Sequence, residues 1–229
     1  MSKTPPTGTG HDSAPTMKSG AQCVIDGLVH AGCEVLFGYP GGAVLDIFNC
    51  LYDAPFRFIL ARHEQGAVHM ADGYARATGK PGCCLVTSGP GATNTVTGLA
   101  TAHMDGIPLI CLTGQVALNM IGNDAFQEAD VIGITRPVTK HNFLVRDADD
   151  LPDILAKAFY IATTGKPGPV VIDLPKNVQK QKTATVPPET VSMRAYHPDV
   201  PINPAEIEQF AEMINQAERP LLYVGGGAI

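Results

Sequence analysis

The sequence has 229 residues, of which 45% are hydrophobic and 17% charged, and its formal net charge is −6. That length and apolar content predict one large or two small globular domains with a sizeable core. The acidic balance, without a cluster of basic residues, argues against a nucleic-acid-binding surface. No apolar run reaches the roughly 18 residues that a membrane span needs.

The first sixteen residues, MSKTPPTGTGHDSAPT, are polar and rich in Pro, Gly and Thr. They contain no apolar core segment of the signal-peptide type, so we expect a disordered leader over 1–16. The six cysteines lie in apolar segments without C-x-x-C spacing, which favours small buried side chains in a reducing compartment over disulfides or metal ligands. We therefore expect a cytoplasmic protein.

From Met17 onward, helical and strand-like segments alternate along the chain. Helical spacing is predicted over 17–32, 42–54, 64–79, 91–106 and 149–165. Short apolar runs predict strands over 33–40, 56–62, 82–89, 108–115, 143–146 and 168–175. This alternation indicates an α/β fold in which helices cover both faces of a doubly wound parallel sheet, over 17–176.

The residues that follow predict a change of domain. Residues 177–203 contain four prolines and little periodicity, which is typical of a linker. Asn203 and Pro204 then suit the N-cap and first position of an amphipathic helix, and PLLYVGGGAI predicts a strand that runs into glycines. Because such a strand has no following helix to cover it, we expect 204–229 to be the truncated start of a second α/β domain. The chain is then a fragment.

Four strand-to-helix junctions are rich in glycine or polar residues, and ligands of parallel sheets bind at such junctions. They are GYPGG at 38–42, ARHEQ at 61–65, TSGPGATN at 87–94 and TGQ at 113–115. One alone would be ordinary turn chemistry, but four together favour a functional edge. The PGG turn leaves backbone N–H groups open to a ligand, although it does not form the G-x-G-x-x-G motif of dinucleotide sites.

Glu64 stands out at the second junction because it is flanked by two histidines. A zinc site of the H-E-x-x-H type needs histidines four residues apart, whereas His63 and His69 are six apart and point to different helix faces. The helix N-terminus favours the charged form of Glu64, and the apolar residues around it favour the neutral form. A carboxyl group under both influences can share a proton with a ligand nitrogen.

A resemblance to a known family rests on eight segments taken together: GYPGGAVLDIF, ARHEQGAVHMADGYARATGKPG, LVTSGPGATNTVTGLATAHMDGIPLI, TGQV, IGNDAFQEAD, TKHNFLV, GKPGPVVIDLPK and LLYVGGG. From about Gly20 to its last residue, the chain resembles the N-terminal part of the large catalytic subunit of the acetolactate (acetohydroxyacid) synthase family. HEQGA and SGPGATN occur across related thiamine-diphosphate enzymes. IGNDAFQE, TKHNFLV and GKPGPVVIDLPK are more specific.

The resemblance implies three domains in the complete protein. The first binds the aminopyrimidine of thiamine diphosphate, the middle one carries most of an FAD site, and the third holds the diphosphate through Mg²⁺ with a G-D-G…N-N motif. No G-D-G occurs in this sequence, so no metal ligand is expected in it. The 229-residue chain alone is therefore expected to be inactive.

The resemblance also implies roles for individual residues. Glu64 would hydrogen-bond the pyrimidine N1′ and promote the imino form that removes the thiazolium C2 proton, and Gln127 would face the reacting centre. Lys166 stands where the family usually has an arginine that touches FAD, and it lacks the bidentate fork of that arginine. The pyrimidine pocket would be lined by Tyr39, Pro40, Gly41, Pro90 and Asn94. The substrate channel would be lined by Phe126, Lys140 and Lys176.

The activity implied is decarboxylation of pyruvate and condensation with pyruvate or 2-oxobutanoate, in isoleucine and valine biosynthesis. A sister thiamine enzyme remains an alternative: a 2-oxo acid decarboxylase, a pyruvate oxidase or glyoxylate carboligase. Glyoxylate carboligase is expected to lack the glutamate that this chain has as Glu64, which counts against it. A non-catalytic subunit-association module is an alternative of another class. The expected partners are further copies, in a dimer or tetramer whose active site lies between subunits, and a regulatory small subunit.

Overall fold

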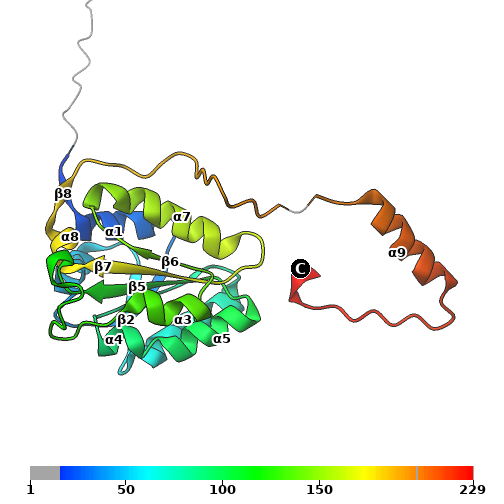
Figure 1. The fold of residues 1–229 in the computed structure, drawn as a ribbon, viewed down its shortest axis with the longest axis horizontal. Helices are drawn as coiled ribbons and strands as arrows, with labels where there is room; N and C mark the ends of the chain where they lie inside the picture. Colours follow the sequence, from blue (N-terminus) through cyan, green and yellow to red (C-terminus); the bar gives the residue numbers. More distant parts are fainter. Residues whose placement is uncertain (1–15, 200, 229) are drawn as a thin grey trace, which may run out of the picture.

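Six parallel strands form the centre of the structure, a computed structural model that describes residues 16–199 and 201–228. Apart from Thr16, the predicted leader lies outside the described residues. The strand order is β3-β2-β4-β5-β7-β6, and every neighbouring pair is parallel. The predicted class is therefore confirmed (Figure 1). The strands are β2 (Val35–Tyr39), β3 (Arg57–Leu60), β4 (Gly82–Val86), β5 (Leu109–Gln115), β6 (His141–Leu144) and β7 (Pro169–Pro175).

Helices cover both faces of this sheet, as Figure 1 shows for α1 and α7 on one side and α3 and α5 on the other. The first face carries α1 (Gly20–His30), α2 (Leu45–Cys50), α7 (Leu151–Thr163) and α8 (Lys176–Lys180). The second carries α3 (Glu64–Thr78), α4 (Pro90–Thr93), α5 (Val96–Asp105) and α6 (Val131–Thr135). Short 3₁₀ turns lie at Leu51–Asp53, Leu118–Met120, Arg136–Val138 and Ala148–Asp150.

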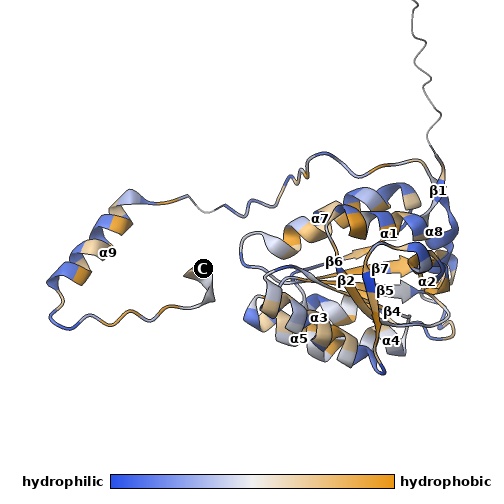
Figure 2. Ribbon diagram, turned by 180° about the vertical axis from the view of Figure 1, so that it is seen from behind, coloured by the Kyte–Doolittle hydropathy of each residue, from blue (hydrophilic) through white to orange (hydrophobic). Residues whose placement is uncertain are grey.

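The pleat of the strands divides the core into two clusters. Cys83 and Leu85 of β4 pack toward α1 and α7, while Cys84 between them packs toward α3 and α5. Successive side chains of a strand point to opposite faces, so a strand buried on both faces must be apolar throughout. Figure 2 shows most of the strands in orange, between helices of mixed blue and orange.

The predicted helix over 91–106 is two helices, α4 and α5, which is a correction. The backbone N–H of Thr95 donates to Ala92 O at 3.1 Å, and the Thr95 hydroxyl donates to the same oxygen at 2.6 Å. A threonine that bonds back to the preceding turn bends a helix. The break turns Asn94, at the end of α4, toward the carboxyl edge of the sheet.

The predicted linker begins later than the sequence indicated. Val178 and Gln179 of α8 are buried against the domain, and Lys182–Thr183 forms a strand, β8, that pairs antiparallel with β1 at Lys18–Ser19. The sequence missed this because one buried valine in a five-residue helix gives no periodic signal. The linker proper starts after Thr183 and runs without helix or strand to Asn203, apart from Val200, which is not described.

Lys140 clamps this linker to the domain, and its predicted place on the substrate channel stays a prediction. It precedes β6, at the amino edge of the sheet, and its ammonium donates to Ile161 O at 2.5 Å and Thr164 O at 2.6 Å, the end of α7. It also donates to Tyr196 Oη of the linker at 2.8 Å. A cation on the last carbonyls of a helix is stabilising, so Lys140 secures both α7 and the linker.

Replacing Lys140 by methionine should release the linker. We expect trypsin to cleave after Arg194, two residues before the clamp, about tenfold faster, because local opening governs cleavage of a folded chain. Lys157→Met is the matched control, because Lys157 is bonded to Asp153 on its own helix and not to the linker. Equal cleavage rates in the two variants would contradict the clamp.

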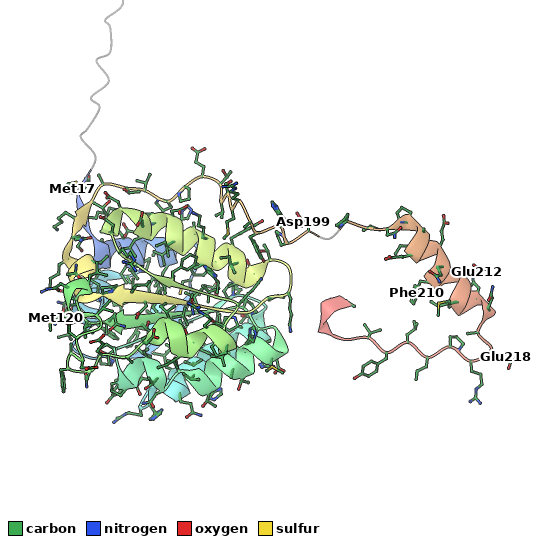
Figure 3. The ribbon with its side chains drawn as sticks, in the orientation of Figure 1. Met17, Met120, Asp199, Phe210, Glu212 and Glu218 are labelled. Carbon is green, nitrogen blue, oxygen red and sulfur yellow. The ribbon has the colours of Figure 1, made fainter. Side chains whose placement is uncertain are left out.

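Residues 204–228 lie apart from the sheet domain, as Figures 1 and 3 show, with Phe210, Glu212 and Glu218 labelled in Figure 3. The predicted helix forms as α9 (Pro204–Gln216), and Asn203 caps it by accepting from the N–H of Ala205 at 3.2 Å. The strand predicted over 220–229 is absent from its described part, which holds only the 3₁₀ turn Gly226–Ala228. A strand needs a neighbour to pair with, and none of the described strands lies beside it. The second α/β domain stays a prediction.

Within the described ranges, all six cysteines are free thiols and four of them are buried. None of the helices described there combines the length and apolar character of a membrane span.

Candidate functional site

The carboxyl ends of β2 and β4 are adjacent, yet the chain leaves them in opposite directions. From β2 it proceeds to β3 at one edge of the sheet, and from β4 it proceeds to β5 on the other side. Such a topological switch point leaves a crevice between the loops that follow the two strands, where ligands of these sheets bind. The two loops here are GYPGG and SGPGATN, which the sequence singled out.

Glu64 is the first residue of α3 and lies beside this crevice. His63 caps the helix, its Nδ1 accepting from the N–H of Gln65 at 3.1 Å, which accounts for this histidine without a metal. The Glu64 side chain is nearly buried, with 9% exposed, and its Oε2 accepts from Asn94 Nδ2 at 3.0 Å. The break between α4 and α5 therefore serves to bring Asn94 to the carboxylate.

The second carboxylate oxygen of Glu64 has no hydrogen-bond donor among the described residues. A Cβ built on Gly91 would lie 3.6 Å from this Oε1, so a side chain there would occupy the space in front of it. One oxygen is thus fixed by Asn94, and the other lies beside Gly91, which has no side chain to cover it. That arrangement fits the edge of a flat heteroaromatic ring with a nitrogen as its hydrogen-bonding atom.

Thr87 joins the two loops of the crevice. Its Oγ1 accepts from the N–H of Ala43 at 3.3 Å, and a Cβ built on Gly41 would lie only 2.4 Å from Thr87 Cβ. The GYPGG turn is therefore packed directly against the start of the SGPGATN loop. Tyr39 and Pro40, both exposed, lie at the rim beside it.

A cavity of about 340 Å³ adjoins the crevice. Its walls bring together three predicted site residues, Phe126, Gln127 and Lys176, whereas Glu64 and Asn94 are not on them. Phe126 is 88% exposed, and Gln127 has a backbone φ of +57°. Met120, also on the wall, is labelled in Figure 3. The remaining walls are Gly42, Ala43, Ser88, Gln115, Val116, Ala117 and Ala125.

The predicted site residues therefore divide between two edges of the sheet. Most follow the carboxyl ends of the strands: Tyr39, Pro40, Gly41, Glu64, Pro90, Asn94, Phe126, Gln127 and Lys176. Lys140 and Lys166 precede β6 and β7 and so lie at the amino edge. Lys166 is beside Gly106, where a built Cβ would be 3.4 Å from Lys166 Cε. A flavin contact at Lys166 stays a prediction, and within this domain it is separate from the Glu64 crevice.

Sequence reasoning missed a buried polar network below the cavity. Asp173 lies in the middle of the apolar strand β7, is 1% exposed, and accepts from Thr113 Oγ1 at 2.7 Å and Gln115 Nε2 at 3.0 Å. Burial raises the pKa of the Asp173 carboxyl to about 7, although the hydrogen bonds from Thr113 and Gln115 act in the opposite direction. A lone aspartate inside an apolar run was the available signal, because unpaired carboxylates are rarely buried.

Replacing Asp173 by asparagine should flatten the pH dependence of stability. The folded-state pKa of about 7 lies above the reference value of 3.8, so the native state binds the proton more tightly and loses stability as pH rises from about 4 to 7. A shift of this size corresponds to on the order of 4 kcal/mol. Denaturant titration measures the free energy of unfolding of Asp173→Asn relative to that of wild type. This difference should favour the variant more at pH 8 than at pH 4. Parallel pH curves would contradict the assignment.

The family model "Thiamine pyrophosphate enzyme, N-terminal TPP binding domain" matches residues 18–134. Three curated relatives cover most of the chain. The acetolactate synthase isozyme 3 large subunit of Escherichia coli is 54% identical over 216 residues, which are 93% of this chain and 38% of that protein. The acetolactate synthase large subunit of Haemophilus influenzae is 53% identical over 92% of this chain and 37% of its own length. That of Corynebacterium glutamicum is 48% identical over 96% of this chain and 35% of its own. The chain thus spans between 35% and 38% of the length of these relatives.

Proposed function

The chain belongs to the thiamine pyrophosphate enzymes and contains their N-terminal TPP-binding domain, and from this we propose that it is part of the catalytic subunit of an acetolactate synthase. TPP is another name for thiamine diphosphate. The reaction proposed is decarboxylation of pyruvate and condensation with a second 2-oxo acid, pyruvate or 2-oxobutanoate, in branched-chain amino-acid biosynthesis. The observation that carries it is the free Oε1 of Glu64 in front of Gly91.

Glu64 is the residue we assign to proton handling at the pyrimidine ring. Thiamine diphosphate, when bound, supplies the carbanion chemistry, and the protein positions and tunes it. Glu64 would share a proton with the ring nitrogen N1′ through Oε1, while the bond from Asn94 to Oε2 keeps the carboxylate from rotating away. The ring would be enclosed by Tyr39, Pro40, Gly41 and Pro90.

The adjoining cavity is the proposed place of the 2-oxo acids. The ammonium of Lys176 on its wall would attract their carboxylates, and the Gln127 amide would donate to the reacting carbonyl. Phe126, which is largely exposed, would form the apolar side of the channel. These roles are supported by the shared location of the three residues.

Two further cofactors belong to the proposal. We assign Lys166 to a contact with FAD. Its positive charge and its exposed position at the amino edge of the sheet support this role. Mg²⁺ would hold the diphosphate, and no residue of this chain is assigned to it. Within the described ranges, no cluster of three or more His, Cys, Asp or Glu side chains is arranged as a metal site.

We propose that the active site lies between subunits of a homo-oligomer, with a regulatory small subunit as a further partner. Large apolar side chains are exposed around the carboxyl edge, among them Tyr39, Leu60 and Phe126. Exposed apolar side chains gathered at one edge support an interface there.

The test is product analysis of the complete protein with pyruvate, thiamine diphosphate, Mg²⁺ and FAD. We expect 2-acetolactate, in keeping with the names of the relatives. Acetaldehyde would instead indicate a decarboxylase and acetyl phosphate a pyruvate oxidase. Absence of any product from pyruvate would favour a non-catalytic subunit-association module.

A further inference from the structure

We propose that Gln115, anchored on Asp173, is a positioning residue that holds the segment carrying Gln127 against the sheet. The claim rests on the proposed function only in treating Gln127 as part of the active site. The buried amide of Gln115 fixes the loop in which Gln127 has a left-handed backbone conformation.

Both the nitrogen and the oxygen of the Gln115 amide form hydrogen bonds, and the residue is buried, with 3% exposed. Its Nε2 donates to Ala129 O at 3.0 Å and to Asp173 Oδ2 at 3.0 Å. Its Oε1 accepts from the N–H of Val116 at 2.8 Å. Because an amide flip would bring its donor against another donor at Val116, the orientation of Gln115 is determined.

The anchor beneath Gln115 is rigid. Asp173 and Thr113 are register partners on the paired strands β7 and β5, and the second carboxylate oxygen of Asp173 accepts from Thr113 Oγ1 at 2.7 Å. Both oxygens of Asp173 are therefore used. Because Thr113 holds one oxygen of this buried carboxylate, the other oxygen is a fixed acceptor for Gln115.

The segment that Gln115 holds is under strain. Gln127 has a left-handed φ of +57°, a conformation that costs a side-chain-bearing residue about 1 kcal/mol or more. The Glu128 carboxylate accepts from the N–H of Gly122 and, at 2.9 Å, from that of Ala125, but these bonds are internal to the loop. Among the described contacts of residues 119–130, the bond from Gln115 to Ala129 O is the side-chain hydrogen bond that joins the loop to the sheet.

Hydrogen exchange of the 229-residue chain tests this directly. Gln115→Met keeps the length of the side chain but removes both donors, and it should raise exchange of amides in 122–130 at least tenfold while β5 and β7 stay protected. Thr113→Val is the matched control, because it removes one bond to Asp173 and does not touch the loop. It should leave exchange of the loop within threefold of wild type. Unchanged loop exchange in Gln115→Met, or equal loosening in Thr113→Val, would overturn the proposal.

Rescue by a conservative change separates positioning from general stability. Asp173→Asn retains an oxygen that accepts from Gln115, so its loop exchange should stay near that of wild type, whereas Asp173→Leu should release the loop as Gln115→Met does. In the complete protein, Gln115→Met should lower kcat about tenfold and leave thiamine diphosphate affinity within threefold. A fall in cofactor affinity alone would contradict positioning of Gln127. If wild type made no 2-acetolactate, the proposed function would fail and the exchange result would stand.

Discussion

Glu64→Gln in the complete protein should slow exchange of the C2 proton of bound thiamine diphosphate by about 10²–10⁴-fold, the usual contribution of a positioned acid or base. The amide can still accept from Asn94, so the geometry at Oε2 is kept. What is lost is the ability of the other oxygen to exchange a proton with the ring nitrogen. The measurement is the rate of deuterium incorporation at C2 by rapid quench.

Asp72→Asn is the control for that experiment. Asp72 is another buried carboxylate of α3, but it is bonded to Arg76 one turn further along the same helix and away from the crevice. We expect its exchange rate to match wild type. An unchanged rate in Glu64→Gln would remove Glu64 from the mechanism, and an equal decrease in Asp72→Asn would reduce the effect to one of helix stability.

Gly89→Ala should strongly destabilise the domain. Gly89 caps α4 with φ +56° and ψ −115°, a region open almost only to glycine, and an added Cβ would lie 2.5 Å from Gln127 O. Strain and overlap together should lower the free energy of unfolding by about 3 kcal/mol. Denaturant titration of the 229-residue chain measures this.

Gly73→Ala is the matched control for Gly89→Ala. Gly73 is exposed in the interior of α3, and a Cβ there meets no atom within 4 Å. Because alanine is the better helix former, this variant should be more stable than wild type by about 0.5–1 kcal/mol. A Gly89→Ala variant within 0.5 kcal/mol of wild type would show that the loop of Gln127 can move aside at little cost.

The sequence predicts the sheet domain well because its signals are local. The apolar run of β4 and the helical spacing of α3, which ends at Gly79 in the left-handed conformation, are readable without knowledge of neighbours. The four polar junctions likewise predict a common edge, since parallel strands end on the same side. The pairing of Glu64 with Asn94 follows from that topology only in outline, because it depends on the break between α4 and α5.

What the sequence could not predict depends on contacts between distant residues. Gln115 and Asp173 are 58 residues apart, and Lys140 meets Tyr196 over 56 residues. Neither pair shows in periodicity or in a motif. The family resemblance gave Lys140 a role but did not give the edge of the sheet on which its side chain lies. The strand predicted after α9 shows the same limit, because pairing needs a partner.

A crystal structure of the complete protein with thiamine diphosphate bound would show whether the free oxygen of Glu64 meets the pyrimidine of the cofactor. We expect N1′ within about 2.6–3.2 Å of Glu64 Oε1, with the Asn94 bond to Oε2 preserved. A cofactor whose pyrimidine lies against other residues, with no donor or acceptor of its ring at Glu64, would contradict it.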